Sequence, residues 1–135
     1  MGTWGIGVFE NDAAADFADD VAKGGLASIE KVFDHVLAVG GGYLEASDAA
    51  EALAAADIVA RLGGSHGVQD AYTASVDGWI ARQQSLPPPA LVDKARRCVS
   101  RMLNEPSEML ELWAEAGELE AWKRSVEAVS ARLEV

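Results

Sequence analysis

Apolar side chains recur at the period of an α-helix along almost the whole chain, and glycine or proline stands at nearly every break in this pattern. Phe9, Ala13, Phe17 and Val21 are four residues apart, which places them on one face of a first helix. Comparable stripes run through residues 26–37, 46–62, 91–103, 109–113 and 119–133, and a weaker one through 75–84. No alternating strand pattern of useful length is present. The pattern predicts an all-α, compact single-domain bundle of six to seven helices.

The ends of the predicted helices carry residues that cap or stop a helix. Asn11 or Asp12 suits the N-cap of the first helix, because its side-chain oxygen can accept a free backbone N–H. Ser47 and Ser107 are the corresponding residues of the third and sixth helices. The third helix is apolar nearly all round, so we expect it at the centre of the fold. A short strand around residues 39–44 would have no obvious partner.

The length of 135 residues suits one domain, residues 1–135. Half of the residues are hydrophobic and many of these are alanine, so closely packed helices can form a core without metal or disulfide. Cys98 is the only cysteine, which excludes an intrachain disulfide and a zinc ribbon and favours a reducing compartment. Cys98 falls in an apolar stripe, so we expect a buried core residue rather than a reactive thiol.

The formal net charge of −11 argues against a protein that binds nucleic acid by attraction to phosphates, because such proteins cluster Lys and Arg. The first residues lack the basic and long apolar regions of a signal peptide. The longest apolar runs fall well short of the ~20 residues that span a bilayer. We therefore expect a cytoplasmic protein that contacts no membrane.

The charges are unevenly distributed along the chain. Residues 1–60 carry 11 acidic and 2 basic side chains, residues 61–103 carry 3 and 6, and residues 104–135 carry 8 and 3. Lys94, Arg97 and Arg101 share one face of the fifth helix, which fits either an anion site or ion pairing. We favour pairing with the acidic helices, or with Asp93 and Glu105 at a spacing of four.

Three sequence blocks suggest a family. The chain opens with MGTWGIGVFEND at residues 1–12, continued by AAADF at 13–17. The other blocks are YLEA at 43–46, which leads to AAAD at 54–57, and SEMLELW at 107–113, which is followed by Trp122 and by Arg132-Leu133. These blocks resemble a bacterial family catalogued as domain of unknown function 4259. The resemblance implies a helical single domain and no assigned activity.

Glycines at positions 2, 5 and 7 surround Trp4. Glycine permits backbone conformations that other residues avoid, so this segment fits a loop that places Trp4 against a ligand. We favour an N-terminal Gly/Trp strap that docks Trp4 and Phe9 in the core, because a tryptophan normally buries a large area. The spacing does not match the G-x-G-x-x-G dinucleotide loop, and no strand precedes it.

Acidic residues recur at helical spacing in three triplets: Asp12, Asp16 and Asp19; Glu45, Asp48 and Glu51; and Glu108, Glu111 and Glu115. Each triplet shares one helix face, and two such faces meeting across a bundle would supply the oxygen ligands that Mg²⁺ or Mn²⁺ prefers. We favour solvated surface, because 22 acidic residues produce this spacing by chance and unpaired carboxylates are seldom buried. His35 and His66 complete no nucleophilic or zinc motif.

These observations leave three functional hypotheses. The leading one is a noncatalytic acidic module that binds a basic protein, in the manner of an immunity protein or antitoxin, through Trp4, Asp12, Asp16 and Glu115. The second is a Mg²⁺- or Mn²⁺-dependent hydrolase of nucleotides or phosphate esters, with ligands drawn from Glu45, Asp48, Glu51, Glu108 and Glu111. The third is a structural homo-oligomer. The sequence indicates no catalytic residue and no cofactor, so we favour a protein that is not an enzyme.

Overall fold

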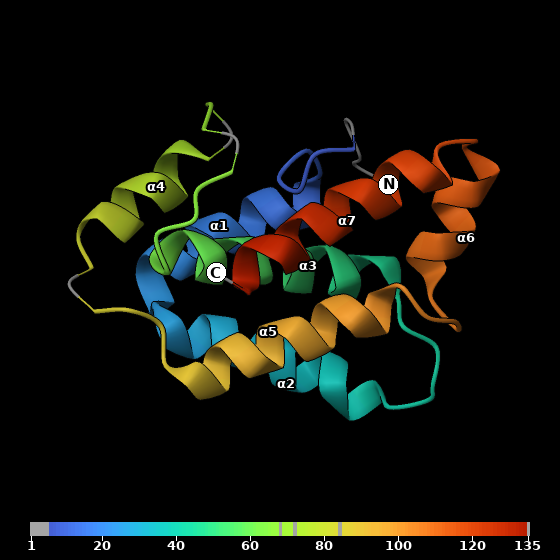
Figure 1. Cartoon of the computed structure of the whole chain (residues 1–135), viewed down its shortest axis with the longest axis horizontal. Helices are drawn as coiled ribbons and strands as arrows, with labels where there is room; N and C mark the ends of the chain where they lie inside the picture. The colour runs from blue at the N-terminus through green and yellow to red at the C-terminus, as the bar shows by residue number, and fades with distance from the viewer. Residues whose placement is uncertain (1–5, 68, 72, 84, 135) are drawn as a thin grey trace.

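The helix at the centre of the molecule is α3, Ala46–Leu62 (Figure 1). In the computed structural model, which describes residues 6–67, 69–71, 73–83 and 85–134, α3 contacts each of the other six helices. All of its residues are buried except Ser47, Asp48 and Glu51 in the first two turns. Alanine covers much of its surface and allows the neighbouring helices to approach closely. The central position predicted from its apolar sequence is confirmed.

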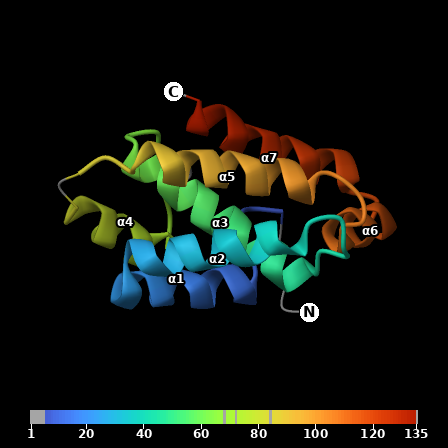
Figure 2. The same ribbon diagram turned by 90° about the horizontal axis from the view of Figure 1, so that it is seen from below.

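Two helices on one side of α3 form a hairpin. Helix α1 spans Asp12–Gly24 and α2 spans Leu26–Val39, so only Gly25 separates them. Gly25 has a φ of 65°, a conformation that favours glycine, and this allows the chain to reverse within one residue. The two helices lie side by side and run in opposite directions (Figure 2). Their buried faces, which include Phe17 and Phe33, pack on α3.

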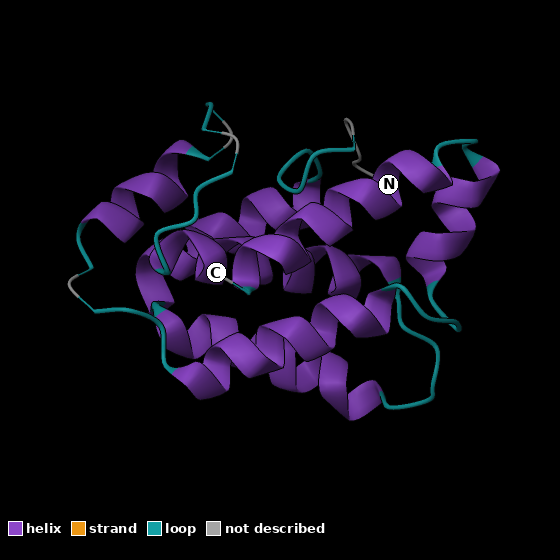
Figure 3. Cartoon of the chain, viewed as in Figure 1, coloured by secondary structure: helices purple, strands orange, loops and turns teal. Residues whose placement is uncertain are grey.

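The remaining helices cover the other side of α3 (Figure 2) and its two ends (Figures 1 and 3). Helices α5 (Pro89–Met102) and α7 (Leu119–Leu133) contact each other and α3. Helix α4 (Ala74–Ala81) packs on α1 and α3, and α6 (Glu108–Glu115) packs on α3 and α7. The described residues form seven helices and no named strand, which confirms the all-α prediction.

The connection between α2 and α3 is tied to the connection between α5 and α6. Leu44 donates its N–H to the carbonyl oxygen of Pro106 (3.1 Å) and accepts the N–H of Glu108 (2.9 Å). These bonds form an isolated parallel bridge between Leu44 and Ser107, in the region where a short strand had no predicted partner. Arg101 Nε donates to the carbonyl oxygen of Gly40 (2.9 Å) and holds the same region together.

One predicted helix cap is confirmed and another is wrong. Asn11 caps α1, because its Oδ1 accepts the N–H of Ala14 at 2.8 Å. Ser47 does not cap α3 but lies inside it. The first N–H of α3, from Ala46, is instead accepted by the carboxylate of Glu108 at 2.8 Å. A side chain distant in the sequence therefore replaces the local cap.

Other helix ends also differ in detail from the prediction. Ser107 occupies the N-cap position of α6, but its hydroxyl donates to the carbonyl oxygen of Met102 (2.9 Å) rather than accepting an N–H of the helix. The fourth helix begins at Ala74 and ends at Ala81, so it is shorter than predicted. None of the helices in the described part of the chain is both long and apolar enough to cross a membrane.

Candidate functional site

Four carboxylates project from the outer face of α1. Asp12, Asp16, Asp19 and Asp20 are all exposed. None of them forms an ion pair within the described part of the chain. The structure therefore places the first acidic triplet in solvent and adds Asp20 to it. We call these four side chains the α1 acidic face.

A groove of about 860 Å³ lies between α1 and α2 and ends at the first two turns of α3. Phe17 and Val32 form the apolar part of its lining. Polar side chains from three helices line the rest: Asp20, Lys23, Ser28, Lys31, Asp34, His35, Asp48 and Glu51. Carboxylates outnumber lysines two to one in this set, and we call the surface the acidic groove.

Carboxylates from α1 and α3 crowd together in the acidic groove. Partial burial raises the pKa of Glu51 above its ordinary value, and the negative charges of Asp48, Asp20 and Asp16 raise it further. His35 opposes this shift, and its Nε2 lies 3.3 Å from Asp48 Oδ2. The packing of α1 on α3 thus brings Asp16 and Asp20 of the α1 acidic face close enough to influence Glu51 of the second triplet.

Two members of the third triplet, Glu108 and Glu111, form hydrogen bonds with protein groups. Besides the bond from Glu108 to the start of α3, Glu111 Oε1 accepts the hydroxyl of Tyr43 at 3.0 Å. Loss of hydration and this bond raise the pKa of Tyr43 to about 12. Within the described residues, no group of three or more His, Cys, Asp or Glu side chains is arranged to hold a metal ion. The proposed ligands Glu45, Asp48, Glu51, Glu108 and Glu111 are therefore not gathered into one metal site.

The remaining predicted contact residues lie elsewhere. Glu115 is exposed at the last residue of α6 and does not line the acidic groove. Phe9 is buried in the core, as expected of the strap. Trp4 lies outside the described residues, so its docking stays a prediction.

The basic side chains of α5 form ion pairs or hydrogen bonds with other groups of the same chain. Lys94 Nζ lies 2.7 Å from Asp34 Oδ1 of α2, and Arg97 Nη1 lies 3.6 Å from Asp93 Oδ2. Arg101 donates to main-chain carbonyl oxygens instead of pairing with an acidic side chain. The favoured interpretation of ion pairing is confirmed for Lys94 and Arg97 and is wrong for Arg101.

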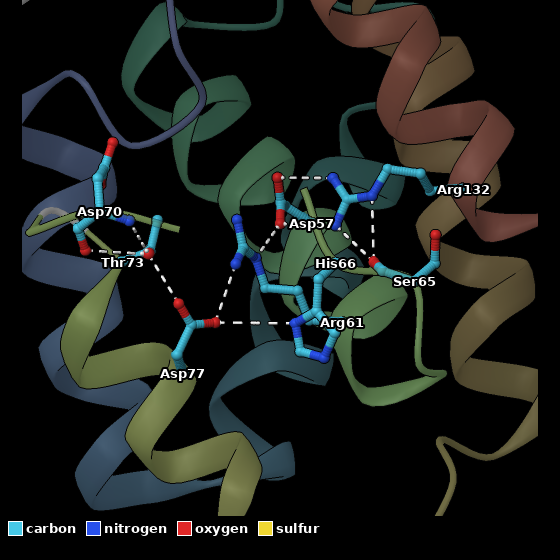
Figure 4. A network of polar contacts seen from close by, with 8 residues as sticks. All are labelled: Asp57, Arg61, Ser65, His66, Asp70, Thr73, Asp77 and Arg132. Atoms are coloured by element: carbon cyan, nitrogen blue, oxygen red, sulfur yellow. Dashed lines mark hydrogen bonds and ion pairs between the residues drawn. The ribbon is translucent and has the colours of Figure 1, made fainter. Parts of the chain in front are cut away.

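A buried network of ion pairs, which the sequence pattern did not predict, joins α3 to α4 and α7 (Figure 4). Asp57 of α3 is 3% exposed and accepts bonds from Arg61 Nε (2.6 Å) and from both terminal nitrogens of Arg132 (3.1 and 3.2 Å). Arg61 is 2% exposed and also donates to Asp77 Oδ1 of α4 (2.9 Å). The expectation that carboxylates face water is therefore wrong for Asp57.

The connection between α3 and α4 completes this network. The carbonyl oxygen of Ser65 accepts bonds from Nε (3.1 Å) and Nη2 (2.8 Å) of Arg132. Thr73 donates its hydroxyl to Asp77 Oδ2 (2.8 Å), and His66 Nδ1 lies 4.0 Å from Asp77 Oδ1. No buried side-chain nitrogen or oxygen in the described residues lacks a hydrogen-bond partner. The charges are thus paired, as buried charges must be.

A cavity of about 240 Å³ opens onto the buried network, and we call it the network cavity. Its walls come from residues 7–10, from Asp57 and Arg61 of α3, from residues of the connection that follows α3, and from the α7 face that ends at Arg132. The guanidinium carbon of Arg61 lies 5.7 Å from the centroid of the Phe9 ring, within the range of a cation–π contact. Buried charges and an aromatic ring therefore share one small cavity.

One feature of the sequence identifies part of the network. Asp57 and Arg61 are four residues apart in a helix that has no polar face after its second turn. A charged side chain in such a helix has no route to water and must find a partner inside. Arg132 carries no comparable signal, because the sequence alone does not show that α7 packs beside Asp57.

The family model described as "Domain of unknown function (DUF4259)" matches residues 2–125 of the chain, in agreement with the resemblance seen in the three sequence blocks. No curated protein and no solved structure matches the chain. The matched range includes the acidic groove, Asp57 and Arg61, and it ends before Arg132.

Proposed function

Since the chain belongs to the family described as a domain of unknown function (DUF4259), its function has to be inferred from its own residues, and we propose that it is a noncatalytic module that binds a basic protein partner. The observation that carries this proposal is the distribution of charge. Four of the eleven cationic side chains form ion pairs with described carboxylates, whereas the four carboxylates of the α1 acidic face form none there and face solvent.

Internal ion pairs neutralise part of the positive charge of the protein. Arg61, Lys94, Arg97 and Arg132 each lie within ion-pair distance of a carboxylate. The carboxylates of the α1 acidic face have no such partner in the described part of the chain. With a formal net charge of −11, the surplus is negative and part of it is concentrated on one helix. Such a surface accelerates association with a partner of opposite charge.

The acidic groove lies beside the α1 acidic face and can accommodate a cationic side chain of the partner. Its Phe17 and Val32 lining suits the aliphatic stem of a lysine or arginine, and Asp20, Asp48 and Glu51 suit the cationic end. The partner we propose is therefore a basic protein, such as the toxin of an immunity pair or a nucleic-acid-binding protein. Its cationic side chains enter the acidic groove after attraction to the α1 acidic face.

Proton release distinguishes this binding mode from general attraction. The pKa of Glu51 is raised in the free protein. A cationic group placed beside Glu51 lowers that pKa, so binding releases a proton when Glu51 starts protonated. We therefore expect the affinity to fall as the pH drops below the raised pKa of Glu51, and the Glu51→Gln variant to lose this component of the pH dependence.

The proposal is tested by affinity capture from cells that express the protein natively, at low salt, with identification of the retained proteins by mass spectrometry. The test variant replaces Asp12, Asp16, Asp19 and Asp20 with Asn. The control variant removes the same number of exposed charges from the region of α7 by replacing Glu118, Glu120, Glu127 and Glu134 with Gln.

We expect a basic protein to be retained by the wild type and by the control variant, to be released by added salt, and to be lost from the α1 variant. Circular dichroism of both variants establishes that they are folded. If no protein is retained above background, or if the α1 variant retains the same protein as well as the control does, the proposal is wrong.

A further inference from the structure

The network cavity has the size of a small-molecule site. Its volume of about 240 Å³ is below the roughly 300–1,000 Å³ of sites for drug-sized ligands, so only a compact molecule fits. Its lining includes charged groups that are almost fully buried, because the side chains of Arg61 and Asp57 are 1% and 4% exposed. A ligand in this cavity would therefore lie beside buried charged groups rather than on an exposed surface.

The walls of the network cavity retain unused hydrogen-bonding capacity. Arg132 makes four hydrogen bonds, and its guanidinium has five N–H groups, which leaves one proton on Nη1. Nη1 lies against another lining residue, Gly67, where an added Cβ would be only 2.7 Å away. The hydroxyl of Ser125 forms no hydrogen bond with another described residue. The carboxylate of Glu10 accepts one hydrogen bond from the described residues, which comes from the N–H of Gly7 (2.9 Å).

The three side chains with unused hydrogen-bonding capacity include both donors and acceptors. Arg132 can donate, Glu10 can accept, and Ser125 can do either. Ser125 and Arg132 are seven residues apart on α7, so their backbone positions are separated by two turns, or about 10.5 Å along the axis. Between them the wall is apolar, with Val129 on α7 and the buried Phe9 also lining the cavity.

The charge of the lining selects against anions. Glu10, Asp57 and Asp70 carry three negative charges, against the two positive charges of Arg61 and Arg132. Asp77 lies behind Arg61 and adds to the negative side. A carboxylate ligand would meet this negative surplus, whereas a neutral carbonyl oxygen can accept from Arg132 without it.

We propose that the network cavity binds a small, uncharged molecule that carries a planar amide, of the size of nicotinamide or a nucleobase. The carbonyl oxygen accepts from Arg132 Nη1, amide N–H groups donate to Ser125 and to Glu10, and the flat body packs between Phe9 and Val129. This site is separate from the acidic groove and does not depend on the proposed protein partner.

The test uses the full chain with nicotinamide and uracil as probes, followed by isothermal titration calorimetry and by the shift of the melting temperature. Nicotinate is the matched anionic control, because it differs from nicotinamide by a carboxylate in place of the amide. We expect at least one neutral probe to bind with a Kd of about 1 mM or tighter and nicotinate to bind at least about tenfold more weakly.

The Ser125→Ala variant locates the site, and Ser130→Ala is its control on the same helix, because Ser130 does not line the cavity. Ser125 makes no hydrogen bond to the described residues, so its removal leaves the fold intact. Loss of one hydrogen bond to the ligand weakens binding about fivefold in Ser125→Ala and leaves it unchanged in Ser130→Ala. Absence of binding by both probes, equal binding of nicotinate, or equal affinities of the two variants would each overturn the proposal.

Discussion

Replacement of Asp57 with Asn tests whether the buried network supports the fold. Asn has nearly the same shape as Asp, so the change removes the negative charge with little change in packing. Arg132 then loses the carboxylate that accepts from both of its terminal nitrogens, and Arg61 loses its shortest ion-pair contact and keeps Asp77. The substitution therefore leaves a buried positive charge without full compensation.

The expected cost is large because the groups are buried. The side chain of Asp57 is 4% exposed, and removal of one partner from a buried ion pair typically costs about 3–5 kcal/mol. For a domain of this length, each kcal/mol lowers the melting temperature by roughly 3–5 °C, so the shift should be about 9–25 °C. Total stabilities of about 5–15 kcal/mol are usual, so the variant should still be folded at low temperature.

The measurement is urea denaturation followed by circular dichroism, with Asp93→Asn as the control. Asp93 also pairs with an arginine at a spacing of four, but its side chain is 64% exposed, so its loss should cost about 1 kcal/mol or less. The double variant Asp57→Asn/Arg132→Gln should lose less than the sum of the two single variants, because the charges are coupled. If Asp57→Asn destabilises the protein no more than Asp93→Asn does, the buried network does not stabilise the fold.

Three further predictions concern other parts of the molecule. Because the pKa of Glu51 is raised in the folded state, ionisation of Glu51 opposes folding as the pH rises. Thermal melts should show Glu51→Gln more stable than wild type at pH 7, with the difference vanishing below about pH 4; equal stabilities at pH 7 would contradict this prediction. Burial raises the pKa of Cys98 to about 12, so a thiol reagent at pH 8 should label the native protein only as fast as it opens and should label the unfolded protein at once; rapid labelling of the folded state would contradict the buried position. Ala54→Leu places a large side chain in the fully buried surface of α3 and should cost about 1–3 kcal/mol in urea denaturation, whereas Ala27→Leu at an exposed position of α2 should cost less than about 0.5 kcal/mol, and equal costs would count against close packing around α3.

The fold was largely predictable because burial of apolar stripes leaves few alternatives to packed helices. Glycine at position 25 marks the turn between α1 and α2 in the sequence, and the structure uses its positive φ there. The caps were less predictable, because the first N–H of α3 is accepted by Glu108, which lies 62 residues further along the chain than Ala46. The local sequence around a helix end cannot show that a side chain distant in the sequence caps it.

The candidate site was predictable only in part. Sequence spacing placed Asp16 and Asp48 on separate helix faces, but the convergence of those faces depends on how α1 packs on α3. The buried network was missed because a pattern that assigns apolar residues to the core assigns charged residues to water. In α3 this assumption fails at Asp57, since a helix buried on all sides offers no water-facing position.

The alanine-rich composition of α3 explains why the fold needs the buried network. Alanine side chains are small and alike, so alanine packing distinguishes poorly between neighbouring registers of one helix against another. Hydrogen bonds to Asp57 are directional, and they fix α7 through Arg132 while Arg61 fixes α4 through Asp77. An arginine held by four hydrogen bonds also keeps its remaining donor in a constant position. The same contacts that align three helices therefore preorganise the wall of the network cavity, which reduces the entropic cost of binding a compact ligand there.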